Sequence, residues 1–141
     1  MTSSPLALSL ESYRILFVED HADTRKLIEL LLADSATLDS VADADAALAL
    51  LADGHTYDLF LIDINLGGGM NGEELLHALR DHPSHTSTPA IACTAYALPG
   101  DADRFFDAGF DEYVAKPFSQ AELRAALAAA LALPGGPGSL Q

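Results

Sequence analysis

Five polar side chains stand where short apolar runs of the sequence end, and their types suit the chemistry of phosphate. They are three carboxylates, a hydroxyl and an amine: Glu19, Asp20, Asp63, Thr94 and Lys116. Three carboxylates in one place repel one another, and a hard divalent cation such as Mg²⁺ relieves that repulsion. A carboxylate, a metal ion and an ammonium group are also what phosphoryl transfer to a side chain requires. The set therefore predicts phosphoryl chemistry, provided that the fold brings it together.

Asp63 is the predicted nucleophile, because it stands at the centre of the set and a glycine-rich loop follows it, not a helix that it would cap. Glu19 and Asp20 are predicted metal ligands, directly or through water, although Asp20 could instead cap the next helix. The backbone carbonyl of Asn65 could add another oxygen ligand to the same metal ion.

Thr94 and Lys116 would contact the phosphoryl group itself. The threonine hydroxyl can donate a hydrogen bond to a phosphoryl oxygen, and the lysine can neutralise charge. Alone, each would be an ordinary loop or surface residue; the other members of the set favour the functional interpretation.

Alternating apolar runs and amphipathic segments would position these residues. Strands are predicted at residues 13–18, 37–41, 57–62, 89–93 and 111–115, and helices at 25–32, 43–52, 71–80, 101–108 and 119–131. This alternation predicts an α/β fold, a doubly wound five-stranded parallel sheet with helices on both faces. In such a sheet, ligands bind outside the carboxyl ends of the strands, where the polar set begins.

Signals at the helix ends agree with this alternation. Asn71 with Glu74 and Ser119 with Glu122 form capping boxes, and Gly109 can close the helix at 101–108. The residues expected to face the core on the first and last helices are Leu27, Ile28, Leu31, Leu32, Leu123, Leu127, Ala130 and Leu131.

Composition bounds the class of protein. The 141 residues suit one domain, predicted at 12–133, with a disordered or extended segment at 1–11 and a flexible tail at 134–141. A formal net charge of −14 disfavours binding to nucleic acid or to anionic membranes. The lone Cys93 excludes an internal disulfide and is expected to be a buried small apolar residue. Without a signal peptide or a run of roughly 18 apolar residues, the expected location is the cytoplasm.

Five segments, each at a strand end, carry a resemblance to a known family. They are Ile15–Asp20, Leu61–Leu66, Met70–Leu75, Cys93–Tyr96 and Ala108–Phe118. Together they resemble the receiver domain of two-component response regulators, over nearly the whole chain from Tyr13 to Leu133. The resemblance implies a flavodoxin-like, CheY-like fold.

The resemblance also implies a role for each site residue. Asp63 matches the phosphoacceptor, and Glu19 and Asp20 match the acidic pair that binds Mg²⁺ or Mn²⁺. Thr94 and Lys116 match the residues that engage the phosphoryl group. By the same resemblance, Tyr113 matches an aromatic switch residue, and the bond from Lys116 to Pro117 is expected to be cis.

Partners follow from the resemblance as well. It implies a stand-alone signalling switch, phosphorylated by a histidine kinase or a histidine phosphotransfer protein and catalysing only its own phosphorylation and dephosphorylation. The surface at 101–108, 111–115 and 119–131 would contact a downstream protein. It could also pair with a second copy through Asp103, Arg104, Glu112 and Arg124.

The loop after Asp63 departs from the family pattern. Leu66 is followed by Gly67-Gly68-Gly69 where the family usually has a proline soon after the leucine, and the loop is one residue longer than usual. Glycines raise the entropy lost when a loop becomes ordered. The loop therefore bears on metal affinity and on the dephosphorylation rate, and not on the assignment of Asp63.

Two other functions remain as alternatives. A phosphatase with an aspartyl-phosphate intermediate would need an acid two residues after the nucleophile, where this chain has Asn65. A receiver-like scaffold acting without phosphorylation would need none of the polar set. The histidines lack the His-Glu-x-x-His metal spacing, and His82 and His85 are expected to be solvated loop residues.

Overall fold

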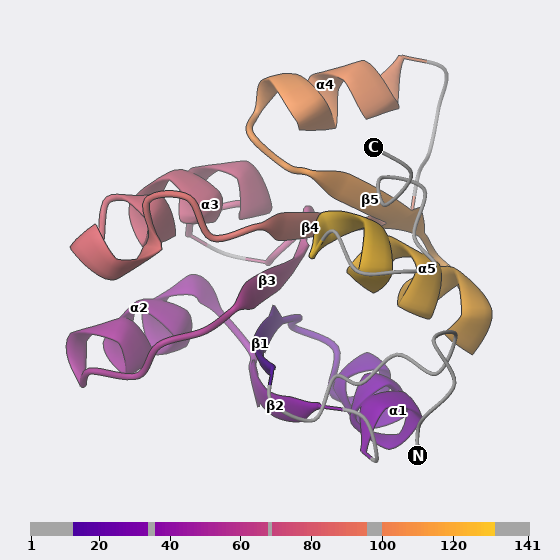
Figure 1. The fold of residues 1–141 in the computed structure, drawn as a ribbon, viewed down its shortest axis with the longest axis horizontal. Coiled ribbons are helices and arrows are strands. Elements are labelled where there is room, and N and C mark those ends of the chain that lie inside the picture. Colours follow the sequence, from indigo (N-terminus) through magenta and orange to yellow (C-terminus); the bar gives the residue numbers. More distant parts are fainter. Residues whose placement is uncertain (1–12, 34–35, 68, 96–99, 132–141) are drawn as a thin grey trace, which may run out of the picture.

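The sheet defines the architecture of the protein. The computed structural model describes residues 13–33, 36–67, 69–95 and 100–131. In these residues five parallel strands pair in the order β2-β1-β3-β4-β5 (Figure 1). Their bounds are β1 Arg14–Val18, β2 Thr37–Val41, β3 Leu59–Asp63, β4 Ala90–Thr94 and β5 Glu112–Ala115. This is the strand order of the flavodoxin-like, CheY-like doubly wound fold, so the predicted fold class is confirmed.

Five α-helices and one short 3₁₀ helix connect the strands. They are α1 Ala22–Leu32, α2 Ala44–Ala52, α3 Gly72–Arg80, η1 Pro83–His85, α4 Asp101–Asp107 and α5 Gln120–Ala130. Both predicted capping boxes are present: the Asn71 side chain accepts from the Glu74 N–H, and Ser119 accepts from Glu122. Gly109 follows the C-terminal cap residue of α4, Ala108, and its φ is 109°, as expected for a helix-closing glycine.

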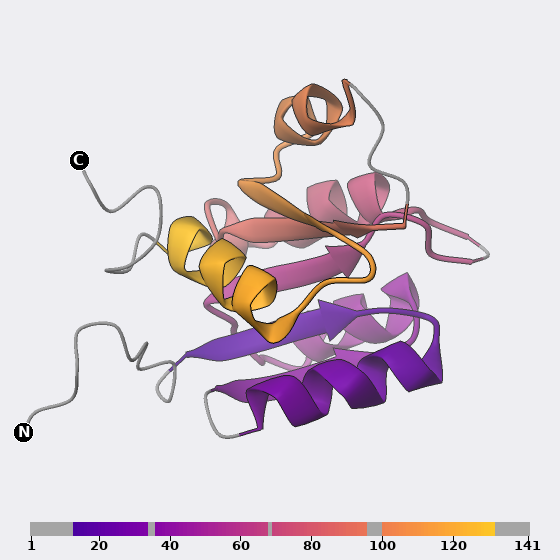
Figure 2. The same cartoon turned by 90° about the vertical axis from the view of Figure 1, so that its right-hand side faces the viewer.

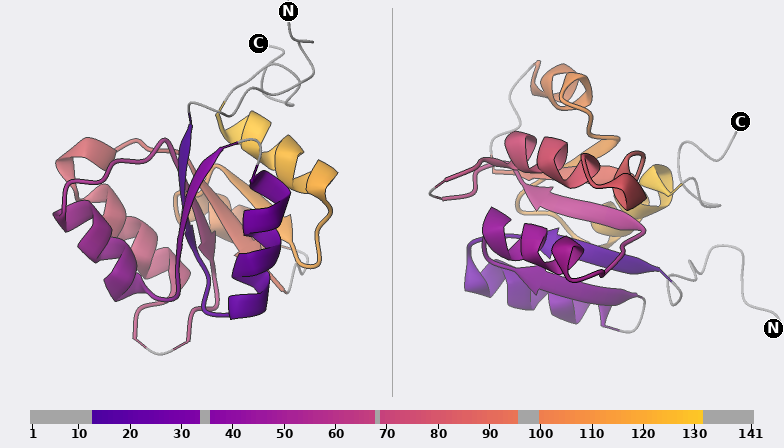
Figure 3. Two further views of the ribbon diagram at one scale, coloured as in Figure 1. Left: turned by 90° about the horizontal axis from the view of Figure 1, so that it is seen from below. Right: turned by 90° about the vertical axis from the view of Figure 1, so that its left-hand side faces the viewer.

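The helices cover the two faces of the sheet, as seen from below in Figure 3 and from the side in Figure 2. On one face, Ile28 of α1 and Leu127 of α5 pack against strand residues that include Phe17 and Leu61. On the other face, α2, α3 and α4 pack against the alternate residues of the same strands. Every residue of β3 and β4 is buried, which explains why these segments read as continuous apolar runs.

Two details differ from the sequence-based expectations. Leu27 was expected to face the core, but 49% of it is exposed, since only Ile28 and Leu32 of α1 are buried. His85 was expected to be solvated, yet it is 1% exposed. Its Nε2 accepts the backbone N–H of Tyr57 at 3.0 Å, and its ring lies 5.2 Å from that of Phe60. His85 is therefore buried because its ring supplies the acceptor for a buried backbone N–H.

The segments predicted at 1–11 and 134–141 lie outside the described residues. Cys93 is fully buried, as expected. Within the described part of the chain, no helix combines the length and the hydropathy needed to cross a membrane.

Candidate functional site

The strand register brings the predicted site residues to one edge of the sheet. Val18 of β1 pairs with Ile62 of β3, so Glu19 and Asp63 follow at the same level. On the other side of β3, Thr94 ends β4 and pairs with Ala115 of β5, which immediately precedes Lys116. Four strand ends therefore supply the site.

An ammonium group lies between two buried carboxylates at this edge. Lys116 Nζ is 2.6 Å from Glu19 Oε1 and 3.5 Å from Asp63 Oδ2. The Glu19 side chain is fully buried and that of Asp63 is 4% exposed. Buried carboxylates need a partner of opposite charge, and Lys116 supplies it to both.

The Asp63 carboxylate is held from two sides. Its Oδ1 accepts the backbone N–H of Asn65 at 3.0 Å, while Oδ2 faces Lys116. A side chain at Gly72 would collide with the backbone carbonyl of Asp63. The start of α3 therefore lies directly against the backbone of Asp63, and only glycine permits that approach.

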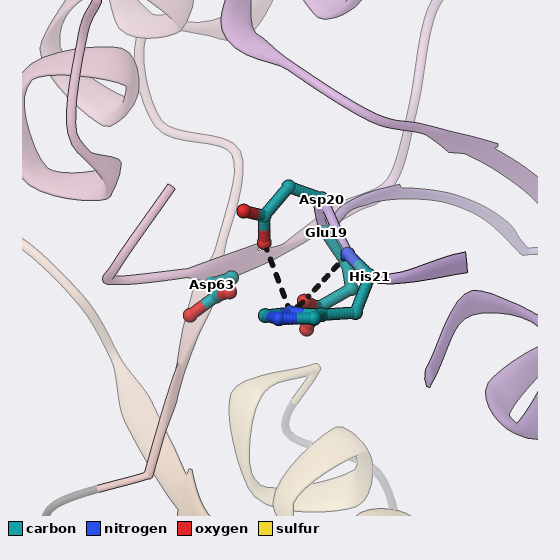
Figure 4. Close-up of side chains that lie close together, drawn as sticks. All are labelled: Glu19, Asp20, His21 and Asp63. Carbon is teal, nitrogen blue, oxygen red and sulfur yellow. Dashed lines mark hydrogen bonds and ion pairs between the residues drawn. The ribbon is translucent and has the colours of Figure 1, made fainter. Parts of the chain in front are cut away.

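Asp20 and His21 form the outer part of the site (Figure 4). His21 Nδ1 lies 3.0 Å from Glu19 Oε2 and 3.2 Å from Asp20 Oδ1. The backbone N–H of Gly67 donates to Asp20 Oδ2 at 3.3 Å, so the glycine-rich loop contacts the acidic pair. Both outer side chains are accessible, at 32% for Asp20 and 70% for His21.

These contacts shift the pKa values in different directions. Burial raises the pKa of Asp63, and the nearby charge of Glu19 adds to this, only partly opposed by the Asn65 N–H and by Lys116. Burial would also raise the pKa of Glu19, but hydrogen bonds from Lys116 and His21 outweigh it and hold that pKa below its ordinary value. The pKa of His21 is raised by its hydrogen bond to Glu19 and by the charge of Asp20.

Lys116 stays charged in this environment. Burial would lower its pKa, but the hydrogen bond to Glu19 and the charge of Asp63 hold the pKa above its usual value. The site therefore contains a fixed positive charge beside Asp63.

The donor atoms fit a divalent cation. One atom each from Glu19, Asp20, His21 and Asp63 lies within 4.8 Å of the others. Carboxylate oxygens are the ligands that hard cations prefer, and the exposed Asp20 leaves room for the waters that Mg²⁺ retains. The acidic edge of the sheet is thus a candidate metal site.

The other two predicted residues, Thr94 and Tyr113, come from the strands beyond β3: Thr94 ends β4 and Tyr113 lies in β5. Thr94 is buried and its backbone carbonyl accepts the Lys116 N–H at 2.7 Å. The ring of Tyr113 is half-buried, 5.9 Å from the ring of Phe105 and 6.3 Å from that of Phe106. The peptide bond between Lys116 and Pro117 is cis, as predicted.

Sequence reasoning missed His21 as a member of the site. Its direct succession to Glu19 and Asp20 was the available signal, whereas a search for spaced histidine pairs could not find it. The contact of Gly67 with Asp20 was also missed, because it joins residues that are far apart in the chain.

Comparison with known proteins agrees with this geometry. A family model described as the response regulator receiver domain matches residues 15–128. A 14.6 kDa protein in the sodA1 3′ region of Leptolyngbya boryana is 36% identical over 116 residues, covering 82% of this chain and 87% of that protein. The signal transduction histidine-protein kinase BarA of Escherichia coli K12 is 32% identical over 111 residues, covering 77% of this chain but only 12% of the kinase.

A solved structure extends the comparison to the site. It is the receiver domain of the sensor histidine kinase PA1611 from Pseudomonas aeruginosa, with a magnesium ion coordinated in its active site cleft. It is 33% identical, with a TM-score of 0.75, and the match covers 86% of this chain and 98% of that one. The chain described here therefore belongs to the family of response regulator receiver domains.

Proposed function

We propose that this receiver domain accepts a phosphoryl group on Asp63 from a phosphorylated histidine of a histidine kinase or phosphotransfer protein. The observation that carries the proposal is the environment of the Asp63 carboxylate. It is buried, oriented by the Asn65 N–H, and 3.5 Å from the ammonium group of Lys116. A structural aspartate needs none of these features together.

The proposed step exchanges one bond to phosphorus for another. An Asp63 oxygen forms the new P–O bond, the P–N bond to the donor histidine breaks, and the histidine nitrogen keeps the electron pair and takes up a proton. Lys116 neutralises charge on the phosphoryl oxygens, and the Thr94 hydroxyl donates a hydrogen bond to one of them. Thr94 ends β4, which pairs with β3, and Lys116 follows β5, which pairs with β4.

A divalent cation, Mg²⁺ or Mn²⁺, would be held by Glu19, Asp20, Asp63 and the backbone carbonyl of Asn65. When bound, it supplies positive charge that reduces the repulsion between the carboxylates and the incoming phosphoryl group. The magnesium ion in the PA1611 receiver supports this assignment.

The histidine kinase among the relatives supports a kinase or phosphotransfer donor. The output would be a change in the surface of α4, β5 and α5, read by a downstream protein or by a second copy, with Tyr113 as the moving ring. Arg104 of α4 already forms an ion pair with Glu73 of α3 at 3.0 Å. Pairing with a second copy through Arg104 would therefore require this ion pair to break and a new one to form between the two copies.

The test is phosphorylation by a small donor. Wild type, Asp63→Asn and the exposed control Asp53→Asn are incubated with acetyl phosphate and Mg²⁺, and their intact masses are measured. We expect a phosphate adduct on wild type and on the control, lost with EDTA, and none on Asp63→Asn. An adduct of equal yield on Asp63→Asn would refute the assignment. No adduct on any variant would favour the alternative, a receiver-like scaffold that acts without phosphorylation.

A further inference from the structure

His21 occupies a capping position without capping. It is the residue before the first turn of α1, yet its side chain accepts no hydrogen bond from the helix. Side chains chosen for this position are usually short oxygen acceptors that bind the free N–H groups of the first turn. The imidazole is instead directed at the carboxylates of Glu19 and Asp20 (Figure 4).

The geometry places one nitrogen where a metal ligand would stand. Nδ1 lies 3.0 Å from Glu19 Oε2 and 3.2 Å from Asp20 Oδ1, and it belongs to the same group of donor atoms as Asp63. The side chain is 70% exposed, so the ring is not locked by packing and can turn by the small amount that coordination requires.

We propose that His21 Nδ1 is an additional metal ligand that adapts this site to divalent transition-metal ions, Zn²⁺ and Mn²⁺ among them, in addition to Mg²⁺. The inference rests on the metal site of the proposed function. Mg²⁺ takes oxygen ligands almost exclusively, whereas imidazole nitrogen binds transition-metal ions well. A nitrogen beside three carboxylates therefore changes which ions compete for the site.

A purely structural role for His21 predicts a different outcome. If the imidazole only holds the carboxylates of Glu19 and Asp20 by hydrogen bonding, its loss should affect all cations alike. Asparagine separates the two roles, because its amide nitrogen stands near the position of histidine Nδ1 and still donates a hydrogen bond, yet this nitrogen has no lone pair available for a metal ion. His55→Asn, at an exposed histidine after α2, is the matched control.

The experiment measures Mg²⁺ and Zn²⁺ affinity by calorimetry for wild type, His21→Asn and His55→Asn. We expect His21→Asn to weaken Zn²⁺ binding roughly tenfold while changing Mg²⁺ affinity by less than about twofold. The ¹⁵N resonance of His21 Nδ1 should shift farther on adding Zn²⁺ than on adding Mg²⁺, because only Zn²⁺ would coordinate this nitrogen. His55→Asn should match wild type for both ions.

Two results would overturn the inference. Equal loss of affinity for both ions would leave His21 a positioning residue, and unchanged Zn²⁺ affinity with an unshifted Nδ1 would remove it from the metal site. In either case the wild-type protein would still bind Mg²⁺ and form the Asp63 adduct. Absence of Mg²⁺ binding by wild type would instead overturn the metal site of the proposed function together with this inference.

Discussion

Lys116 Nζ and Glu19 Oε1 lie 2.6 Å apart, in a pair that joins the loop after β1 to the loop after β5. The Glu19 carboxylate has no exposed surface, and the Lys116 side chain is 21% exposed. Such a pair contributes to stability mainly because either member alone would be a buried, uncompensated charge. The same lysine that would serve the phosphoryl group therefore also keeps Glu19 ionised in the metal-free protein.

Replacing Lys116 with methionine should therefore destabilise the fold. We expect Lys116→Met to lower the free energy of unfolding by about 3 kcal/mol, since Glu19 would remain buried without its partner. Urea denaturation in EDTA measures this. Lys26→Met, on the exposed side of α1, should change the free energy by less than about 0.5 kcal/mol. Equal effects of the two substitutions would contradict a structural role for the pair.

Mg²⁺ should stabilise the folded protein, because the donor atoms of the site come together only in the folded state. At a Mg²⁺ concentration of 100 times the Kd, the expected gain is about 2.7 kcal/mol. Thermal unfolding with and without excess EDTA measures the gain. Asp63→Asn, which removes a charged ligand from the centre of the site, should lose most of it. A gain of the same size in Asp63→Asn would show that Mg²⁺ binds elsewhere.

His85 should make stability depend on pH. Its buried ring accepts the Tyr57 N–H at Nε2, and within the described residues its Nδ1 has no hydrogen-bond partner. Burial lowers its pKa, and the charge of His82, with its ring 5.5 Å away, lowers it further. Well above the unfolded-state pKa of about 6.5, neither state binds a proton at this residue. As the pH falls through this value the unfolded state binds more protons than the folded state, so stability falls.

The variant His85→Gln isolates this contribution, because glutamine stays neutral and retains an acceptor for the Tyr57 N–H. Between pH 7.5 and 5.5 we expect wild type to lose more stability than His85→Gln, by at most about 1.4 kcal/mol per pH unit. His55→Gln should follow the wild-type curve. Parallel curves for wild type and His85→Gln would refute the assignment.

Gly72 should be far less tolerant of alanine than a glycine in open space. A Cβ there would collide with the Asp63 carbonyl and lie 2.9 Å from the Ile64 Cα. We expect Gly72→Ala to lower the free energy of unfolding by roughly 3 kcal/mol and to reduce the Asp63 adduct. Gly54→Ala, at a φ of 95° but with no atom within 4 Å, should lose only about 1–2 kcal/mol from backbone strain and keep the adduct. Equal losses in both variants would show that the close approach of Gly72 to the Asp63 carbonyl has no cost of its own.

The sequence predicted the fold well because local signals and topology agree. Nearly continuous apolar runs became the central strands, and the capping boxes at Asn71 and Ser119 marked two helix starts correctly. The observed ends of some strands differ from the predicted ends by one or two residues. The predicted strand at 57–62 begins at Leu59, since the Tyr57 N–H bonds to His85 instead of to a neighbouring strand.

Other features depend on distant partners that no local pattern reveals. His85 is polar and follows Pro83 closely, so the sequence favoured a solvated position. Its burial is explained by the buried backbone N–H of Tyr57, which needs an acceptor and finds it in His85 Nε2. The roles of Glu19, Asp20, Asp63, Thr94, Lys116 and Tyr113 stay predictions. The structure does bring donor atoms of the three carboxylates within 4.8 Å of one another and Lys116 into contact with Glu19 and Asp63.

The distance along the chain between the members of the site has a consequence for biosynthesis. Glu19 and Lys116 are separated by 97 residues, and β5 is the last strand along the chain and lies at an edge of the sheet. A nascent chain that has not yet released this strand from the ribosome has Glu19 without its countercharge and Asp63 without its lysine. The buried ion pair thus forms only after β5 is made, so a chain that stops before β5 would lack the lysine that the proposed phosphoryl transfer requires.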